Sequence, residues 1–365
     1  MDKSSVVSQA VVEHERSTSV DGQRLEMARN DKPLYSDETI RTVHSWLKFT
    51  HSMLGLIVIL VPLSIWVLSP NNFVAFSLIM FTTTTPLVVT MVGCEISCRL
   101  AIALRRKYPG AFTDIFCSIV KFFSALSVFL HGKLFHGHEV HGIEKLPKTS
   151  GALVIYAHSA LFPSDTLHLL TRQSLLREIT FGGVISRKLW LAMNGVCEFF
   201  SFYTERDRLV ESLKKGHHCA VAPGGSIEAA FSKDYELMWN GRKGFAEVAK
   251  ECGVPIVPMF TTNSQQAMPV STFGFRDLFL AVYERTKEHI FVPLICFPVK
   301  MRTYFGEPIF CGDDETPEEL AKRVEAALYA LRDKHQRRPG NVLLALMERL
   351  GYPAFYNPPK SEKKS

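Results

Sequence analysis

Two apolar stretches without a charged side chain lie close together near the start of this 365-residue chain. The first covers residues 53–68, the second covers residues 73–93, and a polar turn separates them. An α-helix rises about 1.5 Å per residue and a bilayer core is about 30 Å thick, so the second stretch can span a membrane while the first is short. The pair predicts a membrane hairpin of two helices over residues 46–107, either spanning the bilayer or re-entering one leaflet.

Basic side chains flank this hairpin, whereas the turn between its arms has none. The positive-inside rule therefore predicts that both ends of the hairpin, and all that follows, face the cytosol. A buried hairpin of a soluble protein is the less favoured alternative. A cleaved signal peptide is disfavoured because the apolar segment begins far from Met1. The flanking cations are Arg41, Lys48, Arg99, Arg105, Arg106 and Lys107.

Three further segments are distinguished by composition. Residues 1–45 are polar and aperiodic and predict a disordered cytosolic tail, while residues 351–365 predict a loose basic tail. Residues 108–135 carry phenylalanines at helical spacing with Lys121 among them. Such a helix either lies in the membrane interface or packs in a core, and the sequence leaves both open.

From residue 136 to residue 350 the pattern is that of an α/β domain. Short apolar segments alternate with amphipathic ones, which predicts a mixed sheet flanked by helices. The expected strands are 151–157, 219–222, 254–260, 291–297 and 300–305. The expected helices are 165–176, 207–215, 240–252 and 316–334, the last with a capping box at Thr316 and Glu319.

Net charge, cysteine pattern and missing motifs limit the ligands and the enzyme classes that this chain can have. The net charge of +6 suits an anionic surface or ligand but does not by itself indicate nucleic acid. The eight cysteines are scattered, without a C-x-x-C pair, and predict reduced core thiols. The chain has no P-loop, no Rossmann glycine fingerprint and no G-x-S-x-G elbow, so kinase, dehydrogenase and α/β-hydrolase functions lose support.

The run from Cys219 to Glu228 reads Cys-Ala-Val-Ala-Pro-Gly-Gly-Ser-Ile-Glu. An apolar strand ends at Pro223, and a helix begins close to Glu228. We expect the backbone N–H groups near Gly224 and Gly225 to point outward beside the helix N-terminus, where they would stabilise negative charge. Taken alone, the same run is also compatible with an ordinary tight turn.

Two other groups of residues suggest chemistry. His158 closes an apolar strand and Asp165 follows in the next helix, so the carboxylate could hold an imidazole that acts as general base. Taken alone, a histidine at the end of a strand is more often structural. Arg206, Arg242 and Lys243 would contact an anionic group such as a coenzyme A phosphate, or else form a solvated surface. The histidines at 136 and 138 fit a polar edge strand better than a metal site.

Taken in their order along the chain, from His158 and Asp165 through Arg206 and the Pro-Gly-Gly run to Arg242 and Lys243, the motifs resemble the glycerolipid acyltransferase superfamily. The Pro-Gly-Gly-x-x-Glu run and Arg242-Lys243-Gly244-Phe245 are similar to its diacylglycerol acyltransferase type 2 branch. The resemblance covers about residues 45–350. It implies a membrane enzyme of the endoplasmic reticulum that uses fatty acyl-CoA as co-substrate and needs no other cofactor and no metal. It also implies that His158 and Asp165 are catalytic and that the substrate-binding residues are Arg206, Pro223, Gly224, Gly225, Glu228, Arg242 and Lys243.

Two departures from the family pattern bear on activity and substrate. The family motif is H-x4-D, whereas six residues separate His158 from Asp165, so a catalytically inactive membrane scaffold stays an alternative. Relatives that handle phosphorylated acceptors carry Pro-Glu-Gly-Thr followed by Arg, whereas this chain has Gly224 at the acidic position. We therefore expect mono- or diacylglycerol as acceptor, with lysophosphatidate as the alternative. The sequence does not indicate the oligomeric state.

Overall fold

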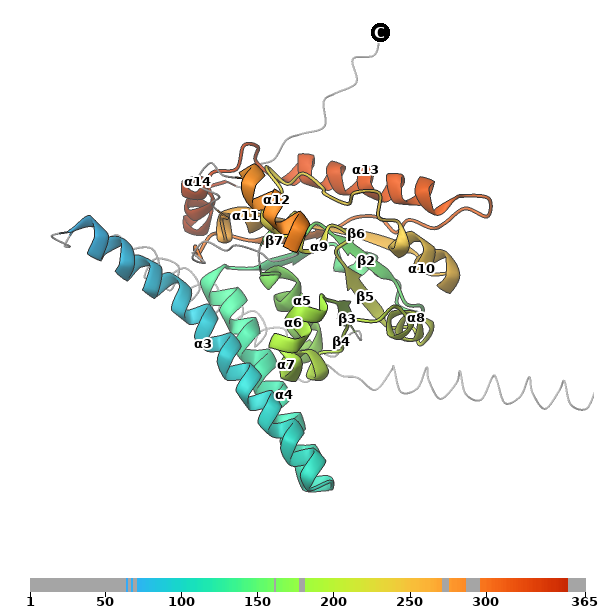
Figure 1. Cartoon of the computed structure of the whole chain (residues 1–365), viewed down its shortest axis with the longest axis horizontal. Helices are drawn as coiled ribbons and strands as arrows, with labels where there is room; N and C mark the ends of the chain where they lie inside the picture. The colour runs from blue at the N-terminus through green and yellow to red at the C-terminus, as the bar shows by residue number, and fades with distance from the viewer. Residues whose placement is uncertain are drawn as a thin grey trace, which may run out of the picture. The chain divides into compact units, whose positions relative to one another are not determined.

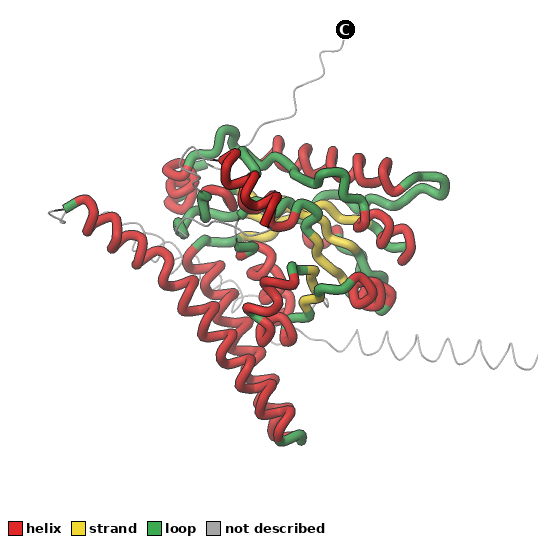
Figure 2. The backbone as a smooth tube through the Cα atoms, in the orientation of Figure 1, coloured by secondary structure: helices red, strands yellow, loops and turns green. Residues whose placement is uncertain are grey.

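The structure is a computed structural model that describes residues 71–160, 162–176, 181–270, 276–286 and 296–353, together with Ser64 and Val67 (Figures 1 and 2). The expected tail over residues 1–45, nearly all of the apolar stretch 53–68 and residues 354–365 lie outside the described residues.

Seven strands among the described residues form one mixed sheet in the order β1-β7-β6-β2-β5-β3-β4. Neighbouring strands are parallel except β6 and β7, which are antiparallel. This confirms the expected mixed α/β architecture. The strands are β1 Glu139–His141, β2 Leu153–Tyr156, β3 Phe181–Val184, β4 Phe202–Tyr203, β5 His218–Val221, β6 Ile256–Thr262 and β7 Arg302–Phe305.

Helices cover both faces of the sheet, so its central strands are apolar on both sides (Figure 2). On β2, Leu153 and Ile155 pack toward α8, α10 and α13, whereas Val154 and Tyr156 pack toward α5. These four helices are α5 Ser164–Leu176, α8 Arg206–Lys214, α10 Gly244–Cys252 and α13 Pro317–His335, and each lies where the sequence predicted one. Shorter helices are α6 Arg187–Ala192, α7 Asn194–Phe199, α9 Gly225–Phe231, α11 Ser264–Ala267, α12 Arg276–Thr286 and α14 Val342–Met347.

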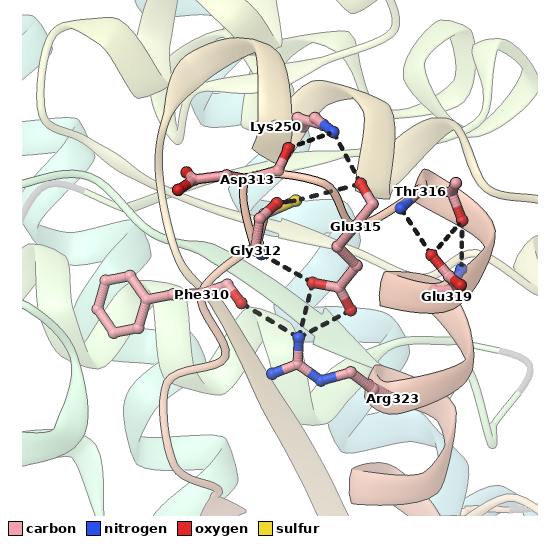
Figure 3. A network of polar contacts seen from close by, with 9 residues as sticks. Lys250, Phe310, Gly312, Asp313, Glu315, Thr316, Glu319 and Arg323 are labelled. Carbon is pink, nitrogen blue, oxygen red and sulfur yellow. Dashed lines mark hydrogen bonds and ion pairs between the residues drawn. The ribbon is translucent and has the colours of Figure 1, made fainter.

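The start of α13 is fixed by the predicted capping box (Figure 3). The Thr316 hydroxyl accepts the Glu319 N–H at 3.3 Å, and the Glu319 carboxylate accepts the Thr316 N–H at 2.9 Å. Just before it, Glu315 accepts the Arg323 guanidinium at 2.7 Å and the Gly312 N–H at 2.9 Å. The capping box gives a partner to the Glu319 N–H, one of the donors that a helix N-terminus leaves unsatisfied, and α13 packs against β6.

Two long apolar helices, α3 Asn72–Lys107 and α4 Ala111–Leu130, lie side by side and pack against α7 and α5 (Figure 1). Small or polar residues fill the joint between them, and Cys98 Sγ lies 3.6 Å from Ser124 Oγ. Leu87, Met91 and Val128 are also buried, but many large apolar side chains point outward. They include Phe81, Val89, Val92, Ile96 and Leu100 on α3 and Phe112, Ile115, Ile119, Phe122 and Phe123 on α4.

By length and composition, the apolar parts of both helices, Ser77–Lys107 and Ala111–Phe135, could cross a membrane. This weakly suggests membrane association. The second apolar stretch of the predicted hairpin therefore lies inside one helix of 36 residues, which continues through the basic flank. The segment expected over residues 108–135 is a helix with one face outward and the other packed on α5, followed by a π-helical turn, His131–Phe135.

Three expectations about local structure need correction. The described end of the strand expected over residues 291–297, Cys296 and Phe297, is irregular. The strand expected at 254–260 begins two residues later, at Ile256. His136 and His138 precede the edge strand β1 and are buried rather than on a polar edge, and His138 Nε2 lies 2.8 Å from Thr303 Oγ1. Burial lowers the pKa of His138 to about 3 and keeps its side chain neutral.

All eight cysteines are free thiols, as the sequence predicted. Six of them are buried, and Cys252 and Cys311 are half-buried.

Candidate active site

The register of two parallel strands brings the two principal motifs together. Ile155 of β2 is paired with Val221 of β5. His158 and Gly224 each lie three residues beyond this pair, at the carboxyl ends of their strands. Since parallel strands end at the same edge of a sheet, the histidine and the glycine turn face the same space, as expected for a ligand site in an open α/β sheet.

The imidazole of His158 is half-buried and held by the loop that follows it. Its Nδ1 lies 2.9 Å from the carbonyl oxygen of Ala160. A carbonyl can only accept, so Nδ1 carries the proton and Nε2 is the basic nitrogen of the neutral ring. A backbone carbonyl therefore does the orienting that the sequence assigned to Asp165.

Asp165 lies in the first turn of α5 and is buried. Its carboxylate faces the Thr261 side chain on β6 and the Thr166 N–H. Burial raises the pKa of this carboxyl, and these two polar groups oppose the rise. Within the described part of the chain, no hydrogen bond or ion pair joins Asp165 to His158. The expected His158–Asp165 hydrogen bond is therefore not formed, and Asp165 instead anchors the start of α5 to the sheet.

Glu228 links the backbone of His158 to the segment that follows the Pro-Gly-Gly turn. Its side chain is 1 % exposed, and its two oxygens accept the His158 N–H at 2.6 Å and the Met238 N–H at 2.7 Å. The sequence predicted a substrate contact for this residue, whereas the structure gives it a buried bracing role. Burial raises the pKa of Glu228 to about 7, although the two backbone hydrogen bonds and Arg242 oppose the rise.

The glycine turn is closed by its own backbone. The Gly225 N–H donates to the Ala222 carbonyl at 3.1 Å across a turn with Pro223 at its second position. Gly225 has a φ of +56°, and a Cβ on Gly224 would overlap the Glu228 carboxylate, so both positions favour glycine. The Gly225 amide is thus not the open donor that the sequence predicted. The N–H groups of Ser226 and Ile227 begin α9 and have no acceptor within that helix.

The predicted cations are engaged by the protein itself. The Arg242 guanidinium donates to the carbonyls of Pro223 at 2.7 Å and of Gly224 at 2.9 Å, so it holds the turn from outside. Arg206 pairs with Glu251 of α10 at 2.6 Å on the surface, and Lys243 pairs with Glu318 of α13.

A small apolar pocket of about 30 Å³ lies beside Tyr156 and was not predicted from the sequence. It lies between the ends of β2 and β3 and the helices α5, α6 and α7, and its wall includes Tyr156, Phe162, Ile185, Leu189 and Met193. These residues come from four separate segments, so no local pattern indicated the pocket. Its position offers an apolar ligand a place beside the carboxyl edge of the sheet.

The described residues contain no group of three or more histidine, cysteine or carboxylate side chains with a geometry that could hold a metal ion. The expectation that the reaction uses no metal stays a prediction.

Comparison with known proteins adds three findings. The acyltransferase family model matches residues 137–262, which hold β1 to β6 and the turn. A Gallus gallus protein named "DGAT1/2-independent enzyme synthesizing storage lipids" is 41% identical over 224 residues, covering 60% of this chain and 66% of its own length. The Homo sapiens protein of that name is 38% identical over 227 residues, covering 60% and 68%.

A crystal structure of the 1-acyl-sn-glycerophosphate acyltransferase PlsC from Thermotoga maritima is similar over 69% of this chain and 97% of its own, with a TM-score of 0.41 and 16% identity. This chain spans about two thirds of the length of the storage-lipid enzymes.

Proposed function

Since this chain belongs to the acyltransferase family of the DGAT1/2-independent enzymes that synthesize storage lipids, we propose that it transfers a fatty acyl group from acyl-CoA to mono- or diacylglycerol. The observation that carries the proposal is the position of His158. The Ala160 carbonyl sets the tautomer of its ring, and strand β2, which His158 follows, ends beside the Pro-Gly-Gly turn. A base and a turn with helix-start amides are the parts that acyl transfer to an alcohol needs.

The proposed mechanism uses this geometry as follows. Nε2 of His158 takes the proton of the acceptor hydroxyl while its oxygen attacks the thioester carbonyl carbon. The carbonyl oxygen then bears negative charge, which the N–H groups at the start of α9 would stabilise. When the tetrahedral intermediate collapses, the C–S bond breaks, and the CoA thiolate receives the proton from the imidazolium. No acyl-enzyme forms.

The engagement of the cations supports a neutral acceptor. Arg242 is used by the turn carbonyls, while Arg206 and Lys243 are paired with glutamates. A lysophosphatidate phosphate would have to compete with these partners, whereas the hydroxyl of mono- or diacylglycerol needs no cation. Their lack of charge would also keep such acceptors in the bilayer, next to the outward apolar faces of α3 and α4. We place the enzyme at the endoplasmic reticulum membrane with its sheet on the cytosolic side.

The test is acyl transfer by the purified full-length chain in lipid nanodiscs, with oleoyl-CoA and either diacylglycerol, monoacylglycerol or lysophosphatidate. We expect triacylglycerol and diacylglycerol as products, and we expect His158→Ala to abolish them. His217→Ala is the matched control, because His217 lies at the start of β5, at the opposite end of the strand from the turn. Faster acylation of lysophosphatidate would overturn the acceptor. Equal product from His158→Ala would overturn the general-base role of His158, and a lack of product from the unchanged chain would support a scaffold instead.

A further inference from the structure

A second hollow, here called the α4 groove, lies between α4 and the C-terminal half of α5. Its wall is formed by Lys121, Phe122, Gln173, Phe181, Phe200 and Ser201. Phe181 is the first residue of β3, whereas His158 follows the carboxyl end of β2, and these strands run in the same direction through β5. The α4 groove is therefore at the opposite end of the strands from the candidate active site.

Gln173 is the most informative residue of the groove. Its side chain is fully buried, and among the described residues neither its amide oxygen nor its amide nitrogen has a hydrogen-bond partner. An unpaired buried amide destabilises a fold by about 1–3 kcal/mol, so such groups usually have a partner. Because Gln173 lies in the groove wall, a ligand that both accepts and donates hydrogen bonds would satisfy it.

Lys121 supplies a positive charge beside this amide. Its ammonium lies 5.9 Å from the centre of the Phe200 ring, and no carboxylate of the described residues pairs with it. The neighbouring cations differ, because Arg105 pairs with Asp114 at 2.8 Å and Arg106 pairs with Glu198 at 3.0 Å.

Ser201 contributes a third polar group, and the rim of the groove is apolar. Ser201 has a φ of +57°, which is uncommon for a residue with a side chain, and its half-buried side chain lines the groove. Phe122, which lines the groove, is 52% exposed, and Ile119, three residues before it on the outward face of α4, is 48% exposed. The groove thus combines one cation, an amide and a hydroxyl with an apolar border.

From this combination we infer that the α4 groove binds the headgroup of an anionic phospholipid. The phosphate lies against the Lys121 ammonium and accepts the Gln173 amide N–H and the Ser201 hydroxyl. A headgroup hydroxyl donates to the Gln173 amide oxygen, and the acyl chains lie along Ile119 and Phe122. The site is separate from acyl transfer and does not depend on the proposed acceptor.

The test is lipid binding to the full-length chain in neutral detergent, measured by native mass spectrometry during titration with phosphatidylglycerol. Phosphatidylcholine with the same acyl chains and inorganic phosphate serve as comparison ligands. We expect one saturable phosphatidylglycerol per chain and about tenfold weaker binding of phosphatidylcholine. Lys121→Gln and Gln173→Leu should each weaken phosphatidylglycerol binding about tenfold, the effect of losing one hydrogen bond to a charged group.

Lys107→Gln is the matched control, because it removes the same charge from the end of α3 without touching the groove. It should leave binding within about twofold of the unchanged chain. An equal loss from Lys107→Gln and Lys121→Gln would overturn the site, since general charge attraction would then explain binding. The site would also be overturned if Gln173→Leu raised the thermal midpoint but left lipid binding unchanged. The same conclusion would follow if inorganic phosphate bound as tightly as the lipid.

Discussion

The carboxyl edge of the sheet and the α3–α4 pair follow opposite rules of burial. At the sheet edge, apolar side chains such as Ile155 and Val154 are fully buried, and the buried Glu228 carboxylate accepts two backbone N–H groups. In the α3–α4 pair, the inside holds Cys98 and Ser124, while phenylalanines and valines face outward. The first arrangement suits water as the surrounding solvent, and the second suits lipid.

The difference teaches where a single change should matter. At the sheet edge each polar group has one fitting partner, so the loss of a group disturbs chemistry or folding. On the outward face of α4 the side chains touch no fixed partner, so changes there should alter where the protein resides rather than whether it folds. The following predictions test this contrast in order of expected effect.

The largest effect should come from His158→Ala, which we expect to lower the rate of acyl transfer by about 10²–10⁴-fold because it removes the general base. Asp165→Asn should lower the rate by less than about tenfold, because Ala160 and not Asp165 holds Nδ1. Initial rates at saturating oleoyl-CoA measure both. Equal losses from the two variants would mean that Asp165 reaches the imidazole in the working enzyme.

The second effect is a dependence of stability on pH through Glu228. Its folded pKa of about 7 lies above the ordinary value of 4.5, so the folded state holds the proton more tightly than the unfolded state. This contribution is complete below pH 4.5 and is lost as the pH rises to about 7. Between pH 5 and pH 8 the free energy of unfolding should fall more for the unchanged chain than for Glu228→Gln, by up to about 3 kcal/mol.

Denaturant unfolding in detergent at both pH values measures this difference. All other titrating groups are the same in the two proteins, so their contribution drops out of the comparison. Identical pH profiles for the two proteins would show that the Glu228 carboxyl is not desolvated.

The third effect concerns the space behind the turn. Gly224→Ala should destabilise the chain by about 2 kcal/mol, because the added methyl overlaps the Glu228 carboxylate. Gly244→Ala is the control, since a Cβ there meets nothing within 4 Å and Gly244 begins α10. The control should be neutral or slightly stabilising in thermal unfolding. A Gly224→Ala chain as stable as the control would contradict the close packing of the turn.

The smallest effect should be a change of location without unfolding. Phe112→Asp combined with Ile115→Asp places two charges on the outward face of α4, where both residues are exposed. We expect vesicle binding to fall by about tenfold while the thermal midpoint in detergent stays the same. Leu213→Asp, in the core between α8 and β5, should unfold the domain instead. A similar loss of stability from both changes would refute the contrast between the two regions.

The sequence predicts the elements whose signals are local. The apolar strands β2 and β5 and the capped helix α13 were recognised because strand runs and capping boxes need only neighbouring residues. Strand β3 was missed because its Phe-Gly-Gly-Val sequence reads as a turn. The structure gives the reason for its glycines: a Cβ on Gly182 would press on the Ser201 carbonyl, and one on Gly183 would press on the Phe202 ring.

The same limit applies to the candidate site. Sequence reasoning found His158 and the Pro-Gly-Gly turn, since each follows an apolar run. It chose Asp165 as the orienting partner because a side chain is visible in a sequence, whereas the Ala160 carbonyl is available from any residue type. The bracing role of Glu228 depends on a contact across 70 positions, which only the packing of β2 against β5 creates.

One feature of the topology bears on how the chain is made. The edge strand β1 follows directly after the apolar helices, but its sheet partner is β7, the last strand to be synthesised among the described residues. During translation α3 and α4 can enter lipid long before Arg302 reaches Glu139. Because contacts between distant segments form late, we expect the outer edge of the sheet to close after the bilayer has been engaged, so that the anchor is placed before the enzyme is complete.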